Sequence, residues 1–311
     1  MYNLADKRVW VAGHNGMVGA AVCRALASEN CEILTVPRNE LDLLRQSDVE
    51  DWCAQAKPDA VIICAARVGG ILANDTFPAD FVYQNLALET NIIHSAYKAK
   101  VEKLVFLGSS CVYPKYANQP INEDALLTGP LEATNEWYAI AKIAGIKLCQ
   151  AYRKQYGCDF ISAMPTNLYG PGDNFDPETS HVVPALMRKC HEAVQKNVDT
   201  VDIWGSGKPR REFMHVDDCA SALIFLLKNY SDTSHINVGT GEDLTIMELA
   251  EIVRDVVKFG GNFNLDSSKP DGTFQKLLDT SLLRSIGWKP VISLPEGLEN
   301  TYAWVTENLD I

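Results

Sequence analysis

The first 170 residues alternate short apolar runs with longer helical stretches, and no other feature restricts the fold as strongly. The runs are rich in β-branched residues, as the buried strands of a parallel sheet are. They are Arg8–Ala12, Glu32–Val36, Ala60–Ala65, Lys103–Leu107 and Phe160–Met164. Helical patterns lie between them at Met17–Ser28, Asn85–Lys98 and Glu136–Tyr156. The alternation predicts an α/β fold, a Rossmann-type doubly wound parallel sheet.

After residue 170 the sequence changes to loops with Gly, Pro and Asn, separated by shorter helices. These helices are predicted at Val182–Gln195, Asp217–Lys228, Ile246–Val257 and Leu294–Asn308. We therefore predict a Rossmann domain over residues 1–170, with contributions from about 212–240, and a smaller α+β lobe formed mainly by residues 171–311. We expect the two parts to share an interface, and the chain to cross back between them near His235–Val238.

Charge and cysteine content argue against several classes of function. The 311 residues carry a net charge of −12, so no basic field attracts nucleic acid or an anionic membrane surface. No stretch approaches the ~20 apolar residues that span a bilayer, and no signal peptide precedes the first strand, which predicts a cytoplasmic protein. Nine scattered cysteines without a C-x-x-C pair argue against a disulfide framework and a zinc site, so no metal is expected.

Three glycines spaced G-x-x-G-x-x-G follow the first apolar run and open the first helix. Gly13 permits a tight turn, Gly16 lets the backbone approach a pyrophosphate, and Gly19 lets helix and strand pack closely. The helix N-terminus offers free N–H groups and partial positive charge to phosphates. A purely structural strand-to-helix turn is the alternative. In its βαβ context the loop predicts dinucleotide binding, and the spacing favours the short-chain dehydrogenase branch.

The second apolar run is followed by Pro37 and Arg38, where an NAD enzyme would place an acidic residue against the ribose hydroxyl. An arginine fork suits a 2′-phosphate, so we predict NADP(H) in preference to NAD(H). The alternative is that Arg38 is a solvated surface charge. Glu40 and Asp42 lie close behind and weaken the inference slightly.

Tyr138 and Lys142 lie four residues apart in the longest helical segment, so phenol and ammonium share one face. A phenol of pKa ~10 is a poor acid at neutral pH, and a fixed cation nearby would lower that pKa. Ser109 or Ser110 follows the fourth run, where open α/β sheets place ligand groups, and can share a substrate carbonyl with the tyrosine. A tyrosine and a lysine at this spacing are often ordinary helix surface. Together with the glycine loop they predict a nicotinamide-dependent carbonyl reductase.

Two further residues are candidates for acid–base chemistry. Cys111 is two residues past Ser109, and on an extended segment it would point to the same side, into the same cleft. His181 begins a helical stretch after the loop that leaves the fifth run. The alternatives are that the cysteine only fills the core and that the histidine is a helix cap or a surface group.

Four long segments resemble the GDP-L-fucose synthase family, the GDP-4-keto-6-deoxy-D-mannose 3,5-epimerase/4-reductases of the extended short-chain dehydrogenases. They are FLGSSCVYPK, NEWYAIAKIAGIKLC, MPTNLYGPGDNF and WGSGKPRREFMHVDD, and the likeness extends over nearly the whole chain. The resemblance implies conversion of GDP-4-dehydro-6-deoxy-D-mannose to GDP-L-fucose by a homodimer that uses NADPH. A 4-keto group acidifies the hydrogens on C3 and C5, so one acid–base pair can invert both centres before hydride reduces C4.

Carried over residue by residue, the resemblance makes Ser109, Tyr138 and Lys142 the reductase set. It makes Cys111 the base and His181 the acid of epimerisation, and a cationic imidazole within reach would favour the thiolate. It places the cofactor at Gly13, Asn15, Gly16, Met17, Val18, Gly19, Arg38, Leu107, Gly108, Ser110, Lys142, Pro165, Asn167, Leu168 and His181. It places the GDP-linked sugar at Lys189, Trp204, Arg211, Asp271 and Lys276.

Three departures from the family pattern bear on these expectations. Asn15 stands where arginine is common, which softens the expected NADP preference. Lys189 also replaces an arginine and loses its bidentate fork while keeping the charge. Phe274 and Gln275 replace a Pro-Arg pair, a change expected to alter the nucleotide or sugar pocket.

Rival functions stay open at this point. One is a related GDP-sugar epimerase/reductase that acts on a 3,6-dideoxy ketosugar, and another is a nucleotide-sugar 4-epimerase or 4,6-dehydratase. A plain 4-epimerase returns its hydride and needs neither Cys111 nor His181. A redox-sensing regulator that binds NADP without turnover is a rival of another class, but such modules usually lack the Tyr138 and Lys142 pair.

Overall fold

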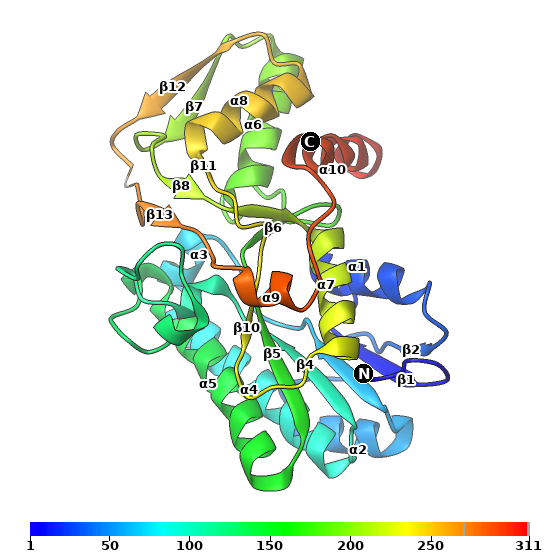
Figure 1. The fold of residues 1–311 in the computed structure, drawn as a ribbon. Coiled ribbons are helices and arrows are strands. Elements are labelled where there is room, and N and C mark those ends of the chain that lie inside the picture. The colour runs from blue at the N-terminus through cyan, green and yellow to red at the C-terminus, as the bar shows by residue number, and fades with distance from the viewer. Residues whose placement is uncertain (270, 310–311) are drawn as a thin grey trace.

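The larger part of the protein is a six-stranded parallel sheet, seen in a computed structural model that describes residues 1–269 and 271–309 (Figure 1). The strand order is β10-β5-β4-β3-β1-β2. The strands are β1 Arg8–Ala12, β2 Glu32–Leu34, β3 Ala60–Ile63, β4 Lys103–Leu107, β5 Asp159–Pro165 and β10 Ile236–Val238. The order reverses between β1 and β3, which is the topological switch point of such sheets. The predicted Rossmann-type α/β fold is confirmed.

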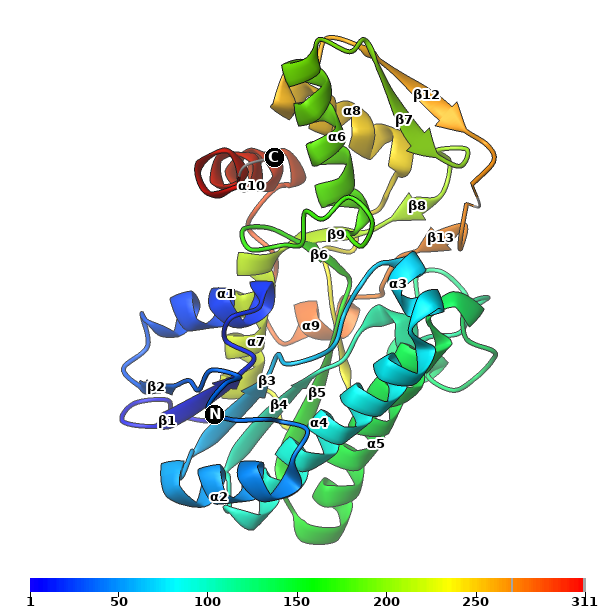
Figure 2. The same ribbon diagram turned by 180° about the vertical axis from the view of Figure 1, so that it is seen from behind.

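Helices cover both faces of this sheet (Figures 1 and 2). On one face lie α1 Met17–Leu26 and α7 Val216–Asn229, and on the other α2 Gln46–Ala56, α4 Pro78–Lys98 and α5 Glu136–Tyr156. Alternate residues of a strand point to opposite faces. In β1, Val9 and Val11 enter the first core, whereas Trp10 and Ala12 enter the second. Strands buried on both faces read as continuous apolar runs, which is why the sequence reveals them.

Several element boundaries differ from the predicted ones. Strands β2 and β3 each end two residues earlier than expected. Helix α4 begins at Pro78, because proline suits the first turn, where its missing N–H has no helical partner to lose. Asn85, the predicted start, lies inside the helix, and its side-chain amide donates to the Phe81 carbonyl at 2.8 Å. Helix α2 was not predicted, since its buried stripe is narrow and consists of Val49 and Cys53.

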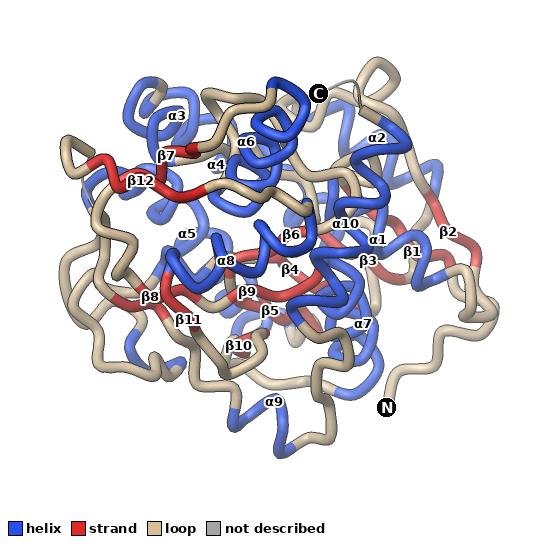
Figure 3. The backbone as a smooth tube through the Cα atoms, turned by 90° about the horizontal axis from the view of Figure 1, so that it is seen from above, coloured by secondary structure: helices blue, strands red, loops and turns tan. Residues whose placement is uncertain are grey.

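The smaller lobe has a core of its own and lies over the carboxyl ends of the large sheet's strands (Figures 1 and 3). Its elements are α6 Val182–Lys196, α8 Ile246–Val257 and α10 Leu294–Asn308, with β7 Thr200–Trp204 parallel to β12 Asn262–Asp266. Between the lobes, β8 Arg210–Arg211 lies between β11 Leu244–Thr245 and β13 Gln275–Lys276, and β6 Asn167–Tyr169 pairs with β9 Phe213–His215. Two short helices are α3 Ile71–Thr76 and α9 Ser281–Ser285.

The chain crosses between the lobes in its second half. Strand β10 extends the large sheet beside β5, so the segment expected to cross back does so. The segment after β13 then bonds to the loop that follows β4. The Leu277 backbone N–H donates to Gln119 Oε1, and the Ile121 N–H donates to the Leu277 carbonyl, both at 2.8 Å. These hydrogen bonds connect the residue after β13 to the loop that follows β4. The domain boundary at residue 170 stays a prediction.

Within the described part of the chain, no helix combines the length and apolar character needed to cross a membrane.

Candidate active site

The glycine loop joins β1 to α1 at the carboxyl edge of the sheet, beside the end of β3. Gly13 has φ +91°, and a Cβ there would lie 2.6 Å from the backbone nitrogen of Ala65. A Cβ at Gly19 would clash with the Gly13 carbonyl. Packing therefore requires both glycines. Gly16 is exposed, and a Cβ there would meet only the Gly13 oxygen, at 3.5 Å. An open backbone at a helix N-terminus fits a dinucleotide pyrophosphate.

Four more of the residues predicted to bind the cofactor lie in this loop, at the start of α1 or after β2. Asn15 is exposed in the turn, and Met17 and Val18 are half-buried at the start of α1. Gly172, in the loop after β6, approaches the Met17 backbone, where an added Cβ would lie 3.7 Å from the Met17 Cα. Arg38 follows β2 and is exposed. Its role towards a 2′-phosphate stays a prediction.

Six further residues predicted to bind the cofactor lie at the ends of β4 and β5, directly after β4, or in β6. They are Leu107, Gly108, Ser110, Pro165, Asn167 and Leu168. Gly108 packs so tightly on Met164 that a side chain there would clash. The side-chain amide of Asn167 donates to the Glu212 carbonyl at 2.8 Å. The structure thus gives both residues a packing role in addition to the predicted one.

Helix α5 and the end of β4 bring Tyr138, Lys142 and Ser109 to one place. The Lys142 Nζ lies 5.7 Å from the centroid of the Tyr138 ring and donates to the Leu107 carbonyl at 3.0 Å. Ser109 caps a short 3₁₀ helix at Ser110–Val112, against which α5 packs. The helical spacing that suggested the pair is therefore realised on the face directed at the strand ends.

Burial raises the pKa of Tyr138 well above its ordinary value, and the charges of Cys111 and Glu89 raise it further. We expected the Lys142 ammonium to lower the pKa of Tyr138, but this pKa is raised all the same. The reason is that its Nζ is paired with Glu89 Oε1 at 2.7 Å, with both side chains only 2% exposed. The carboxylate offsets the positive charge that would otherwise act on the phenol. The tyrosine is thus held in its protonated form, which is the form that can donate a proton.

Cys111 is buried in the 3₁₀ helix, so the extended segment predicted for it is wrong. The Ser109 side chain causes the turn by accepting a hydrogen bond from the Cys111 backbone N–H at 3.3 Å. Burial raises the pKa of the thiol, and the opposing effects come first from Lys276, then from Ser109 and Lys142. These groups favour the thiolate, in place of the His181 imidazolium that we expected.

His181 is the residue before α6, and its side chain makes no capping hydrogen bond. The preceding Thr179 carbonyl accepts a hydrogen bond from the Gly70 N–H at 3.1 Å, which fixes this loop against the segment after β3. The residue keeps an exposed surface, but the protein packed around the ring lowers its pKa by desolvation. The neutral imidazole is therefore favoured, and a proton added to it is readily given up.

Two of the predicted sugar-nucleotide residues lie on paired strands, and one of them acts on Cys111. Lys276 of β13 is in register with Arg211 of β8, and the charge of Glu132 raises the pKa of both. Burial lowers the pKa of Lys276 while the Cys111 thiolate raises it. Two half-buried cations on adjacent strands, one of them acting on a thiol, form a site suited to an anionic ligand.

The other three lie around the end of β7. The Lys189 Nζ lies 5.4 Å from the Trp204 ring centroid, and Trp204 is 57% exposed. The Asp271 carboxylate accepts hydrogen bonds from the Ser206 N–H and hydroxyl at 2.6 and 2.8 Å, so it shapes this loop. Sequence reasoning missed Lys269, whose Nζ lies 5.1 Å from the same ring. An open indole flanked by two ammonium groups is a platform for a nucleotide base and its phosphates.

Glu89 is a second residue that sequence reasoning missed. Its signal was an acidic residue among the apolar positions Leu88, Ile92 and Ile93 of a helix, which is the face expected to be buried. Of the two adjacent family departures, Phe274 precedes β13 and is exposed, and Gln275 begins β13 and donates to Asp243 at 2.7 Å.

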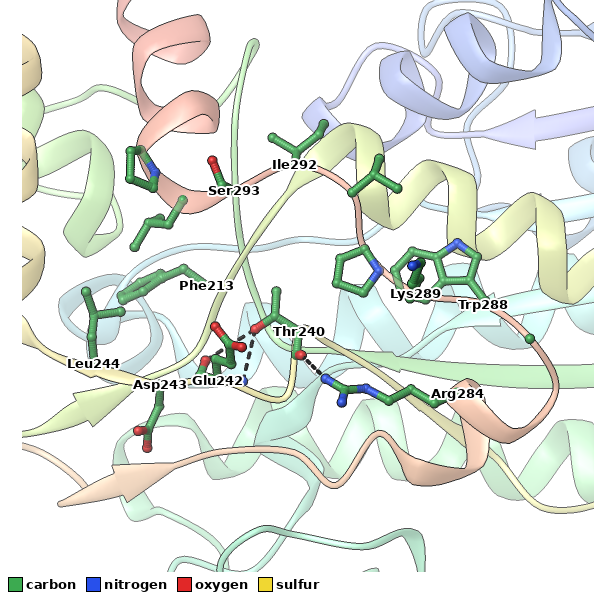
Figure 4. Close-up of a pocket in the computed structure, with 15 residues that line it drawn as sticks. Phe213, Thr240, Glu242, Asp243, Leu244, Arg284, Trp288, Lys289, Ile292 and Ser293 are labelled. Carbon is green, nitrogen blue, oxygen red and sulfur yellow. Dashed lines mark hydrogen bonds between the residues drawn. The ribbon is translucent and has the colours of Figure 1, made fainter.

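A cavity of about 790 Å³ lies between the connection from α9 to α10 and the loop after β10 (Figure 4). Trp288, Phe213 and Leu244 contribute apolar walls, and Arg284 donates to the Thr240 carbonyl at 2.6 Å. Among the described residues, none of those predicted to bind cofactor or substrate lines this cavity. It is therefore distinct from the candidate active site.

Comparisons with known proteins agree with this geometry. The NAD dependent epimerase/dehydratase family matches residues 9–239. GDP-L-fucose synthase of Sinorhizobium fredii is 62% identical over 99% of this chain and 98% of its own, and that of Escherichia coli is 53% identical over 99% of both. The crystal structure of a GDP-L-fucose synthetase from Naegleria fowleri bound to NADP has a TM-score of 0.92 and 28% identity, covering 99% of this chain and 96% of that one.

Proposed function

The chain belongs to the NAD dependent epimerase/dehydratase family, and we propose that it converts GDP-4-dehydro-6-deoxy-D-mannose to GDP-L-fucose. The reaction is 3,5-epimerisation followed by NADPH-dependent reduction of the 4-keto group, in nucleotide-sugar biosynthesis. One observation carries this function: the Cys111 thiol lies in the same buried cluster as Tyr138 and Lys142. A 4-epimerase that only moves hydride has no use for an acid–base thiol there.

NADP(H) supplies the hydride when bound, and the open glycine loop at the start of α1 suits its pyrophosphate. The exposed guanidinium of Arg38 is the group available for the 2′-phosphate. Lys142, fixed at the end of β4, is placed to bind the nicotinamide ribose.

The chain's own residues divide the chemistry between two sets. Cys111, as thiolate, removes the acidic protons at C3 and C5, and His181 returns a proton on the opposite face. Lys276 favours that thiolate. Arg211, in register with Lys276 on the neighbouring strand, is the cation that we assign to the diphosphate of the GDP-sugar. Ser109 and Tyr138 then polarise the C4 carbonyl, and the phenol gives its proton to the oxygen. The high pKa of Tyr138 keeps that proton in place until the alkoxide forms.

A 3,6-dideoxy ketosugar lacks the hydroxyl at C3, so only C5 can be inverted there. Inversion at both C3 and C5 thus distinguishes the 6-deoxy substrate. The proposed function is tested by incubating the protein with GDP-4-keto-6-deoxymannose and NADPH in D₂O and examining the product by NMR. We expect deuterium at C3 and C5, one NADPH oxidised per sugar, and the L-fuco configuration. Conversion without oxidation of NADPH would rule out the reductase function.

The pH dependence of exchange tests the role of Lys276. Burial raises the thiol pKa, so the rate of C3 and C5 exchange should rise with pH through the alkaline range. Lys276→Met removes the charge that most strongly opposes the rise of the Cys111 pKa, so this pKa should rise further. The rising part of the pH–rate profile, its alkaline limb, should then move to higher pH by on the order of one unit. Lys276→Arg keeps the charge and should keep the limb. A limb that stays in place in Lys276→Met contradicts this prediction.

We also infer a homodimer that works in the cytoplasm. Large side chains are exposed on the neighbouring helices α4 and α5, among them Tyr83, Trp137 and Ile140 (Figure 2). Burying them against a second copy would remove apolar surface from water. All nine cysteines lie in the described part of the chain and are free thiols, which suits a reducing compartment. Light scattering on the wild type and on Ile140→Glu would report the dimer and its loss.

A further inference from the structure

Glu89 forms an ion pair with Lys142 inside the protein. It lies on the buried face of α4, and its Oε1 is 2.7 Å from the Lys142 Nζ on α5, with both side chains 2% exposed. Removing a carboxylate from water is unfavourable unless a partner compensates, and burial raises the pKa of Glu89 while Lys142 opposes that rise. The positive charge of Lys142 therefore compensates the buried negative charge of Glu89.

The surrounding backbone is shaped around this pair. Gly145 brings α5 close, since a Cβ there would clash with the Phe106 ring and would lie 3.0 Å from Glu89 Oε2. The Lys142 Nζ also donates to the Leu107 carbonyl at 3.0 Å and lies 4.7 Å from the Phe106 ring centroid. The ammonium thus has two polar contacts, one from α4 and one from β4. An ammonium carries three N–H donors, so a third is left for the ribose that the proposed function assigns to Lys142.

The charge of Glu89 also reaches the proton donor. It raises the pKa of Tyr138, as does Cys111, and it raises the pKa of Cys149. Tyr138 therefore faces Cys111 from the turn after β4 and Glu89 from α4, while Lys142 lies on its own helix. Of these groups, Glu89 is the one to which the proposed function assigns no role.

We propose that Glu89 is a positioning residue for the reductase: through its ion pair it holds Lys142 against the end of β4, beside Tyr138. This inference rests on the proposed function, in which Tyr138 and Lys142 carry out the reduction. It separates the two half-reactions, because the Cys111 thiolate of the epimerase is favoured first by Lys276 and then by Ser109, and only after them by Lys142.

The test is Glu89→Gln, which keeps the shape and removes the charge. Reduction should slow by about tenfold or more, whereas C3 and C5 exchange should change by less than about twofold. Loss of the carboxylate lowers the pKa of Tyr138, so the alkaline fall of kcat for reduction should move to lower pH. NADP⁺ affinity, measured by isothermal titration calorimetry, should weaken several-fold, because Lys142 loses its orientation.

Asp159→Asn is the matched control. Asp159 pairs with the other deeply buried lysine of this domain, Lys103, at 2.7 Å, where β4 and β5 begin. This variant removes the carboxylate partner of a buried lysine at the opposite end of the strands, although Asp159 itself is 33% exposed, and it should leave the pH profile and NADP⁺ affinity unchanged. If Glu89→Gln does not fold, Glu89→Asp retains the charge but withdraws the carboxylate by about 1.5 Å. It should show the same slower reduction and weaker NADP⁺ binding.

Equal losses of reduction and exchange in Glu89→Gln, or an alkaline limb that stays in place, would overturn the positioning role. Tyr138→Phe separates the two claims. If Tyr138→Phe is inactive in reduction and Glu89→Gln is normal, only the role of Glu89 is wrong. If Tyr138→Phe still reduces the sugar, the role assigned to Tyr138 is wrong, and if the wild-type protein oxidises no NADPH with the GDP-4-keto sugar, the proposed function itself is wrong.

Discussion

Tyr138→Phe is expected to slow NADPH-dependent reduction roughly a thousandfold while NADPH affinity stays within about threefold of wild type. In the proposed function the phenol hydroxyl is the proton donor to the C4 oxygen, and its high pKa means that the proton is present at neutral pH. Phenylalanine keeps the ring and its edge-on contact with Phe81, whose centroid lies 6.4 Å away. Stopped-flow absorbance of NADPH measures the rate, and fluorescence titration measures the affinity.

A second tyrosine on the same helix provides the control. Tyr152 accepts or donates a hydrogen bond with His94 at 2.6 Å, and the same Tyr152→Phe change should leave reduction within twofold. Because Tyr138 takes no part in removing protons from C3 and C5, exchange should continue in Tyr138→Phe. Reduction above one tenth of the wild-type rate in that variant would contradict the assignment.

Cys111→Ser and His181→Ala are each expected to stop deuterium from entering C3 and C5, with losses on the order of a hundredfold to ten-thousandfold. A serine hydroxyl ionises far less readily than a thiol. The cations that favour the Cys111 thiolate therefore cannot convert the serine hydroxyl of the Cys111→Ser variant into an equivalent base. Removal of the imidazole takes away the proton donor on the other face. NMR of the sugar in D₂O measures both centres separately.

The reverse half-reaction distinguishes a chemical loss from a structural one. Oxidation of GDP-L-fucose by NADP⁺ requires the reductase set and should persist in Cys111→Ser. Cys158→Ser, in a half-buried thiol just before β5, is the matched control and should leave exchange unchanged. Wild-type exchange in Cys111→Ser or His181→Ala would remove that residue from the epimerase.

Much of the fold could be predicted, because its strands are buried on both faces and its longest helices have regular apolar periods. Helices α5, α8 and α10 have the predicted bounds, whereas α2 was missed because only two of its side chains are fully buried. The strands β7 and β12 of the smaller lobe were also not predicted. These two strands pair with each other although they lie far apart in the chain, so no local sequence pattern indicates the pairing.

Tyr138 and Lys142 and the dinucleotide loop could be predicted without a structure, since both are contiguous motifs whose geometry follows from one helix or one turn. The charges that act on them come from elsewhere in the fold. Glu89 meets Lys142 because α4 packs on α5, and Lys276 reaches Cys111 because β13 pairs with β8 and bonds to Gln119. The physical reason is that a pKa depends on burial and on charges in contact, and the fold sets both through residues distant in the chain.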